Sequence, residues 1–326
     1  MILPYYMRLL CLCLATFFVV HTVGCLMVCS VARAMVSMAA AIRPRVSSRL
    51  LFALRMAPAA ITVFVVVGFC VPSYIWMEPH VQNERVGLAC LLAATLGGMG
   101  WAVSLLRGSA SVLRTAYYVR ECGLNAEAID PGDGLPDVLL VEDGAAVMAV
   151  AGVLRPRLMA SRSVMDTLSR EEKEVALRHE LAHRESRDNL KKLLILLSPD
   201  LLPFTSGLAT LERGWSRFAE WAADDAAVSG DALRALSLAS ALVRVARLGV
   251  HPAPAHLLSS LAEADRDLEM RVERLLSEPA YAERALQPLL TVGRNAMLLC
   301  GGLTVAVLLW PGSLGGIHRL LEHLVQ

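Results

Sequence analysis

Four long apolar runs, none containing a Lys, Arg, Asp or Glu, dominate the hydrophobic pattern of the chain. They cover residues 9–32, 57–77, 86–106 and 295–314. A helix of about 20 apolar residues crosses the roughly 30 Å hydrocarbon core of a bilayer, so each run predicts a membrane-spanning helix. Aromatic side chains that favour the membrane surface fall near the ends of these runs: Tyr5, Tyr6, Tyr74, Trp76 and Trp310.

The basic residues beside these runs predict how the protein lies in the membrane. Five arginines follow the first run, at positions 33, 43, 45, 49 and 55, whereas the stretch after the second run holds only Arg85, beside Glu78 and Glu84. Basic residues collect on the cytoplasmic side of a membrane. The loop after the first run and the charged block after the third are therefore expected in the cytoplasm, with both termini outside. A bacterial cytoplasmic membrane is the expected location.

The first run has an alternative interpretation as a cleaved signal peptide, because "HTVGC", ending at Cys25, is similar to a lipoprotein cleavage box. However, Thr22 stands where such boxes carry a Leu-like residue, and Arg8 is the only basic residue before the run. The apolar run also continues past Cys25. A retained helix is therefore the preferred interpretation.

A fifth apolar stretch, residues 193–211, is interrupted by Pro199, Asp200 and Pro203. It is too broken to span a bilayer alone, and periodicity does not decide between a buried helix, an interfacial hairpin and a re-entrant segment. The whole pattern divides the chain into a membrane region, a folded domain, and a last helix with a short tail: residues 1–106, 107–288 and 289–326.

The composition narrows the class of protein. The chain is 56% hydrophobic and only 19% charged, which is typical of a membrane protein. Its formal net charge of +1 gives no sign of a basic surface, so no nucleic-acid partner is expected. Seven of the eight cysteines lie in apolar runs, as small buried hydrophobic residues do, and they form no disulfide framework.

The charged middle block predicts a small sheet followed by a helix. The stretch "DVLLVEDGAAVMAVAGVLRPRLMAS" holds two β-prone runs about the turn "EDG" and a third run after Pro156. Ser169 and Glu172 then form the capping-box pattern that begins a helix near Arg170. This helix is expected to continue to about Leu197.

Two histidines and a glutamate on this helix form the pattern HExxH. His179 and His183 are four residues apart, so both imidazoles lie on one helix face and can bind one metal ion. Glu180 is placed to take a proton from a water molecule activated by zinc. A catalytic zinc needs a third protein ligand, and Glu220 in "RFAEWAADDAAV" is the candidate. Asp224 shares the face of Glu220 and can hold a ligating imidazole by a hydrogen bond.

These residues resemble a known group of enzymes. "VALRHELAHRESRDNL" followed by "AEWAADDAAV" is similar to membrane metallopeptidases of the gluzincin type. These are the β-lactam-sensor and antirepressor peptidases, the heat-shock membrane proteases and the CAAX prenyl endopeptidases. The resemblance implies one zinc ion per chain, Glu180 as its general base, and a set of ligands and supporting carboxylates: His179, His183, Glu220, Asp224 and Asp188.

The β-lactam-sensor branch is the most similar in layout, and softer matches extend from about Ala145 to Leu276. Only about a dozen residues follow the last apolar run, without the extracellular sensor domain of that branch, so direct β-lactam sensing is not expected. The expected fold is a mainly α membrane protein with four transmembrane helices. A cytoplasmic α+β gluzincin-type catalytic domain is inserted between the third and the fourth.

Three further side chains are candidates for stabilising a transition state. Arg271, in "LEMRVERLL", matches an arginine of the family, and three roles are open for it: to stabilise an oxyanion, to pair with an Asp, or to form a surface salt bridge. His251 and His256 lie in the proline-rich stretch "HPAPAH". In addition, the run 145–150 is a candidate edge strand to which an extended substrate adds through backbone hydrogen bonds.

The expected function is zinc-dependent peptide hydrolysis at a membrane, in regulatory or quality-control proteolysis. The candidate substrates are a cytoplasmic repressor, a membrane protein and the protein itself. A homodimer is one possible oligomeric state. The alternative is a non-catalytic signalling or assembly subunit with a retained or vestigial zinc site, although no fourth His or Cys stands at a spacing that would close a structural site. A further alternative is a transporter in which HExxH occurs by chance. Charged residues within membrane spans are typical of transport pathways, and the four apolar runs contain none.

Overall fold

The computed structural model describes residues 4–77, 86–123, 126–130, 137–141, 148–201, 206–248, 258–260 and 265–277. Over these residues the protein is mostly helical and contains a small five-stranded sheet. Three helical stretches are long and apolar enough to cross a membrane: Tyr5–Ala39, Pro44–Trp76 and Leu88–Gly123. The fourth apolar run, 295–314, lies outside the described residues, as does the whole predicted region 289–326.

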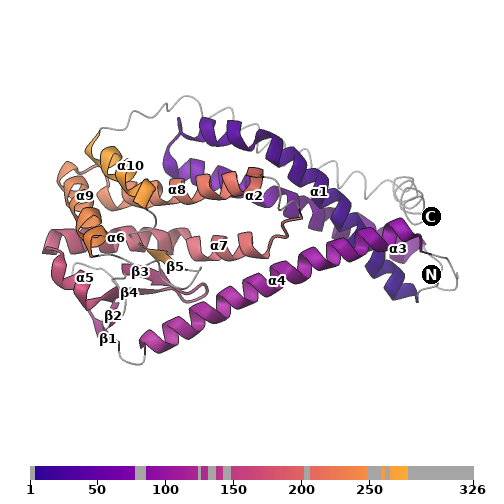
Figure 1. The fold of residues 1–326 in the computed structure, drawn as a ribbon, viewed down its shortest axis with the longest axis horizontal. Coiled ribbons are helices and arrows are strands. Elements are labelled where there is room, and N and C mark those ends of the chain that lie inside the picture. The colour runs from indigo at the N-terminus through magenta and orange to yellow at the C-terminus, as the bar shows by residue number, and fades with distance from the viewer. Residues whose placement is uncertain are drawn as a thin grey trace.

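Each of the three apolar stretches extends beyond the run that predicted it (Figure 1). The helices are α1 (Tyr5–Ala39), α2 (Pro44–Val65) and α4 (Leu88–Gly123), and α2 continues through the π-helical turn η1 (Val66–Cys70) into α3 (Val71–Met77). Proline has no N–H to donate to the carbonyl four residues before it. The π-helical turn ends at Cys70, two residues before Pro72, and such turns accommodate proline in long apolar helices.

The outward faces of these helices carry large apolar side chains. Tyr6, Met27, Val67, Leu88 and Leu106 are each more than half exposed. Contiguous apolar surface of this kind is rare on soluble proteins and marks contact with lipid or with another protein. The three helices are therefore compatible with a membrane protein.

Helices α1 and α4 approach each other closely at Gly97. A Cβ atom placed on Gly97 would lie 2.5 Å from the carbonyl oxygen of Leu14, a backbone atom that cannot move aside. On the neighbouring Gly98 the nearest atom would be Leu14 Cδ1, at 3.7 Å, an ordinary contact. Only the first glycine is thus required for the close approach of the two backbones, as small residues are at helix interfaces in membranes.

Replacing Gly97 by Ala is expected to lower the stability of the protein by about 1–3 kcal/mol, because the added methyl group overpacks the α1–α4 contact. Gly98→Ala is the matched control. It is expected to be neutral or to stabilise by up to about 1 kcal/mol, since Ala favours a helix over Gly. Unfolding of both variants in the same detergent is the measurement, and equal losses at the two positions would contradict the close approach.

The sheet contains β1 (Glu127–Ile129), β2 (Val138–Val141), β3 (Met148–Ala151), β4 (Arg157–Ser161) and β5 (Leu258–Ser260), in the order β1-β2-β4-β3-β5. Strands β2 and β4 are parallel, and the other pairs are antiparallel. The three β-prone runs form strands as predicted, but β2 and β3, which are consecutive in the chain, do not pair with each other. Strand β4, whose last four residues are all buried, lies between them.

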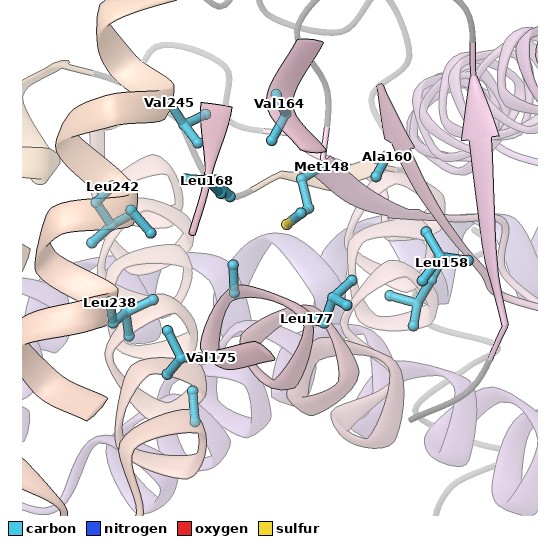
Figure 2. Packing of buried hydrophobic residues seen from close by; sticks show 14 of the residues in the cluster. Met148, Leu158, Ala160, Val164, Leu168, Val175, Leu177, Leu238, Leu242 and Val245 are labelled. Atoms are coloured by element: carbon cyan, nitrogen blue, oxygen red, sulfur yellow. The ribbon is translucent and has the colours of Figure 1, made fainter. Parts of the chain in front are cut away.

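Helices cover both faces of the sheet. On one face Met148, Leu158 and Ala160 pack against α6 (Arg170–Ser186) and α9 (Ala232–Arg247), as Figure 2 shows. On the other face Met159 and its neighbours pack against Tyr118, in the last turns of α4. Helix α4 was expected to end near residue 106, but its continuation to Gly123 covers this face. The same helix therefore belongs both to the apolar bundle and to the domain.

A second core joins the domain to the apolar helices. Helix α8 (Ser206–Val228) packs its apolar face, including Leu211 and Phe218, against α1 and α2. A Cβ placed on Gly207 of α8 would lie only 2.6 Å from the Cα of Cys29 in α1, so these two backbones are almost in contact. The position of α8 is therefore set largely by the two apolar helices.

Candidate metal centre

Helix α6 presents the HExxH residues to the interior of the domain. It begins at Arg170, as predicted, with the reciprocal capping box formed: Ser169 Oγ accepts from the Glu172 N–H, and Glu172 Oε2 accepts from the Ser169 N–H. His179, Glu180 and His183 are all at most 2% exposed. Three polar side chains on one short stretch of helix are thus removed from solvent, which is costly unless each has a partner.

The helix does not continue to Leu197, so that prediction is wrong. It ends at Ser186, and Arg187 adopts the left-handed conformation, with φ 54° and ψ 42°. A new helix, α7 (Asp188–Leu197), then begins. The reversal brings the Asp188 carboxylate back to His183, with Oδ2 2.8 Å from Nδ1, and Lys191 donates to its other oxygen at 2.7 Å. The left-handed backbone conformation of an arginine costs about 1–2 kcal/mol of folding free energy. The contact between Asp188 and His183 forms directly after this turn.

His179, His183 and Glu220 are brought together in an arrangement that fits a metal ion. The two Nε2 atoms are 3.2 Å apart, and they lie 3.5 Å and 3.4 Å from the carboxylate oxygens of Glu220. Ligand atoms at 2.0–2.1 Å from a tetrahedral zinc ion are separated by roughly 3.3 Å. The distance between the two imidazoles, and the distance from each imidazole to one of the two Glu220 oxygens, are therefore close to those between ligands of one zinc ion.

Each histidine is held so that the same ring nitrogen faces the centre. His179 Nδ1 lies 2.9 Å from Asp224 Oδ1, and His183 Nδ1 lies 2.8 Å from Asp188 Oδ2. The hydrogen bond between Asp188 and His183 Nδ1 fixes the tautomer with its hydrogen on that atom and leaves Nε2 as the donor to a metal, and Asp224 lies close enough to His179 Nδ1 to do the same there. Both supporting carboxylates are the ones that the sequence predicts for this role.

No family model and no curated protein sequence matches the chain. The resemblance to gluzincin-type peptidases therefore rests on the motif residues, and the interpretation of the site rests on its geometry.

The carboxylates of the site outnumber its permanently charged basic side chains. Burial alone would lower the pKa of His183, but the nearby Glu220 carboxylate and the hydrogen bond with Asp188 raise it to about 10. Burial opposes a raised pKa in His179 too, and the contacts with Asp224 and Glu220 outweigh it. The carboxylates around the two imidazoles therefore strongly favour an added positive charge at this place. A divalent cation can supply that charge in place of protons, which is the fit expected of a metal site.

Glu180 is the buried carboxylate of the motif with an unused oxygen. Its Oε2 accepts a hydrogen bond from the backbone N–H of Val150 in β3 at 3.1 Å, whereas Oε1 has no hydrogen-bond partner among the described residues. Burial raises the pKa of this carboxyl group to about 7, against the opposing effect of the two histidines. A buried acceptor without a partner usually indicates an absent water molecule, ion or ligand.

Arg271, on α10 (Asp265–Leu276), pairs with the carboxylates of the site. Its Nη2 and Nε donate to the two oxygens of Asp224 at 2.7 and 3.0 Å, and Nη1 lies 3.2 Å from Glu220 Oε2. Of the three roles that the sequence leaves open, these contacts show pairing with an Asp, and because Arg271 is buried the pair is not a surface salt bridge. Desolvation raises the pKa of Asp224, but Arg271 and His179 lower it to about 2, so the carboxylate is ionised.

The other predicted site residues are placed differently or not at all. His251 and His256 lie outside the described residues. The candidate edge strand is also corrected: β3 pairs with β4 on one side and with β5 on the other, so it is not an edge of the sheet. An extended substrate can pair with β3 only after β5 has left.

Asn189 is a site residue that motif reasoning did not identify. Its Nδ2 donates to the carbonyl oxygens of Val150 and Gly152 at 2.9 and 3.0 Å. The Val150 peptide units are thus held on both sides, by Glu180 at the N–H and by Asn189 at the C=O. The only signal in the sequence is that Asn189 follows Asp188, whose role is predicted, at the first turn of α7.

Proposed function

We propose that the chain is an integral membrane zinc endopeptidase that hydrolyses peptide bonds in protein substrates. The observation that carries the proposal is the close grouping of His179, His183 and Glu220 next to the buried oxygen of Glu180, which has no hydrogen-bond partner among the described residues. Among the residues that the structure describes, three candidate ligands meet there, and three protein ligands leave a position for water or substrate, as in catalytic zinc sites. Asp224 and Asp188 would orient the two imidazoles, and Arg271 would balance the charge of Asp224 and Glu220.

A zinc ion held by these residues would act as a Lewis acid that polarises the scissile carbonyl group and makes a water molecule more acidic. Glu180 is the group placed to move the protons. Its Oε1 would accept one proton from the attacking water as the C–O bond forms, and it would deliver that proton to the leaving nitrogen as the C–N bond breaks. The Val150 N–H holds the second oxygen and fixes the orientation of the carboxylate.

The proposed substrates are proteins or peptides: a cytoplasmic repressor, a membrane protein or the protein itself. Strand β3 runs beside Glu180, and it is paired with β4 on one side and with β5 on the other. Addition of a substrate strand to β3 is therefore not part of the proposal.

The proposal includes the topology predicted from the sequence. Four membrane spans would place both termini outside and the domain, between the third and the fourth span, in the cytoplasm. Leu197, at the end of α7, packs against Gly108, next to the end of the third apolar run. Helix α7 is ten residues long, or about 15 Å. The metal centre at its other end would thus lie beside the membrane rather than within it.

Metal dependence is the test of this function. Full-length protein purified in detergent is expected to hold about one zinc ion per chain and to cleave casein or itself. A chelator should abolish cleavage, and zinc should restore it. Magnesium should not, because it requires octahedral oxygen ligands. Bound zinc without cleavage under any condition would favour the non-catalytic signalling subunit, and a chain that binds no zinc would refute the site.

A further inference from the structure

Arg55, on α2, is a buried guanidinium group that contacts two parts of the domain at once. It is 2% exposed. Its Nε donates to Glu212 Oε1 at 2.8 Å, and its Nη1 donates to Ser198 Oγ at 3.2 Å. Ser198 directly follows α7, and Glu212 lies in the second turn of α8. One side chain therefore joins α2 to the end of α7 and to the beginning of α8.

The described residues that follow α7, 198–201, lie against the apolar helices. The fully buried His21, in the middle of the first predicted span, donates from Nε2 to the carbonyl oxygen of Pro199 at 2.8 Å. A Cβ placed on Gly100 of α4 would lie 2.3 Å from a methyl carbon of Leu201. Of the three interpretations that the sequence left open for residues 193–211, a re-entrant segment fits these contacts of Pro199 and Leu201.

Both helices that Arg55 holds carry parts of the metal centre. The first residue of α7, Asp188, orients His183, and α8 supplies Glu220 and Asp224. Glu212 and Glu220 are eight residues apart on one unbroken helix, or about 12 Å. Because helices move as rigid rods over such lengths, the positions of their ends at Arg55 determine where these carboxylates stand relative to the histidines.

Only the arginine of this ion pair is buried, since the Glu212 side chain is 39% exposed, so the pair is expected to contribute little to stability. Burying a guanidinium group costs several kcal/mol, and apolar residues of similar volume often stabilise a buried site as well or better. A guanidinium group that makes several hydrogen bonds instead fixes the geometry of its partners, because its planar N–H donors point in only a few directions. Here those partners, Ser198 and Glu212, belong to the two helices that flank the centre.

We propose that Arg55 is a positioning residue for the metal centre. By holding Ser198 and Glu212 together it fixes the separation of α7 and α8, and the packing of the apolar helices thereby sets how tightly the centre binds zinc. The inference rests on the proposed zinc site, and it concerns the affinity for the metal rather than the chemistry of cleavage.

The test is the zinc affinity of the full-length apoprotein, measured by competition with a chromophoric chelator. In Arg55→Met/Glu212→Met, an apolar pair replaces the ion pair without leaving a lone charge. We expect its Tm to equal or exceed that of the parent and its zinc affinity to fall roughly tenfold or more, as for other residues that orient metal ligands. Arg55→Lys can hold Glu212 but not both partners, so its affinity should be intermediate.

Leu12→Ala is the control, because it opens a cavity in the cluster with Cys70 and Tyr74, at the other end of the bundle. Its Tm should fall while its zinc affinity stays unchanged. A double variant that binds zinc as tightly as the parent would overturn the inference, and so would a Leu12→Ala variant that loses as much affinity. A parent that binds zinc but cleaves nothing would refute the proposed endopeptidase and leave this inference standing, whereas a parent that binds no zinc would refute both.

Discussion

Replacing Glu180 by Gln is expected to lower peptide cleavage by roughly 10²–10⁴-fold, the usual contribution of a general base, with zinc still bound. The amide has the shape of the carboxylate, and its oxygen can still accept from the Val150 N–H, which now binds Oε2. It cannot take a proton from water. The measurements are kcat on a fluorogenic casein and the zinc content of parent and variant.

The same substitution should leave the stability of the apoprotein unchanged or raise it. Burial raises the pKa of Glu180 because the ionised carboxylate is poorly solvated there, and a neutral amide avoids that cost. Glu174→Gln is the matched control: Glu174 lies on the same helix and pairs with Arg178 near the surface, so cleavage should be unaffected. Full cleavage by Glu180→Gln would show that another group is the base.

Arg271→Met is expected to produce the largest loss of stability, about 3–5 kcal/mol in the apoprotein, because it removes one partner of a buried ion pair. Arg271 is 2% exposed and lies against both Asp224 and Glu220. Without it, two buried carboxylates face each other with only the histidines for compensation. Zinc would return positive charge next to Glu220, so the loss should shrink when zinc is bound. Thermal unfolding of both proteins with and without zinc measures the difference.

Arg274→Met is the matched control on the same helix. Arg274 pairs with Asp225, whose side chain is 40% exposed, and its guanidinium lies 5.3 Å from the centre of the Trp221 ring. Exposed pairs of this kind contribute about 1 kcal/mol or less. If the two variants lose the same stability, or if zinc does not reduce the loss in Arg271→Met, then Arg271 does not balance the charge of the site in the way described.

The parts of the site that could be predicted are those set by local helix geometry. His179 and His183 share a face because they are four residues apart, and the same spacing relates Glu220 to Asp224. The capping box at Ser169 and Glu172 likewise depends only on residues in one turn. These relations hold wherever the helix packs, so the amino-acid sequence contains them.

The remainder depends on contacts between distant segments. Nothing local indicates that Arg187 adopts a left-handed conformation, since that residue type carries no such preference, and the contact between Asp188 and His183 accompanies it. The order of the strands, with β4 between β2 and β3, likewise depends on pairing between separate segments of the chain. Arg107 marks the end of an apolar run but not the end of α4, because a helix continues as long as one face packs, here against the sheet.

The unbroken length of α4 has a mechanical consequence. Its 36 residues make a lever about 54 Å long, with one end in the apolar bundle and the other under the sheet. A tilt of about 5° at Leu88 would move Gly123 by about 5 Å, close to the spacing of neighbouring strands. Long helices tilt when the thickness of a bilayer changes. The sheet can keep its place beside α6 only if α1, α2 and α8 tilt with α4, so in a bilayer the bundle and the domain would have to turn as one body.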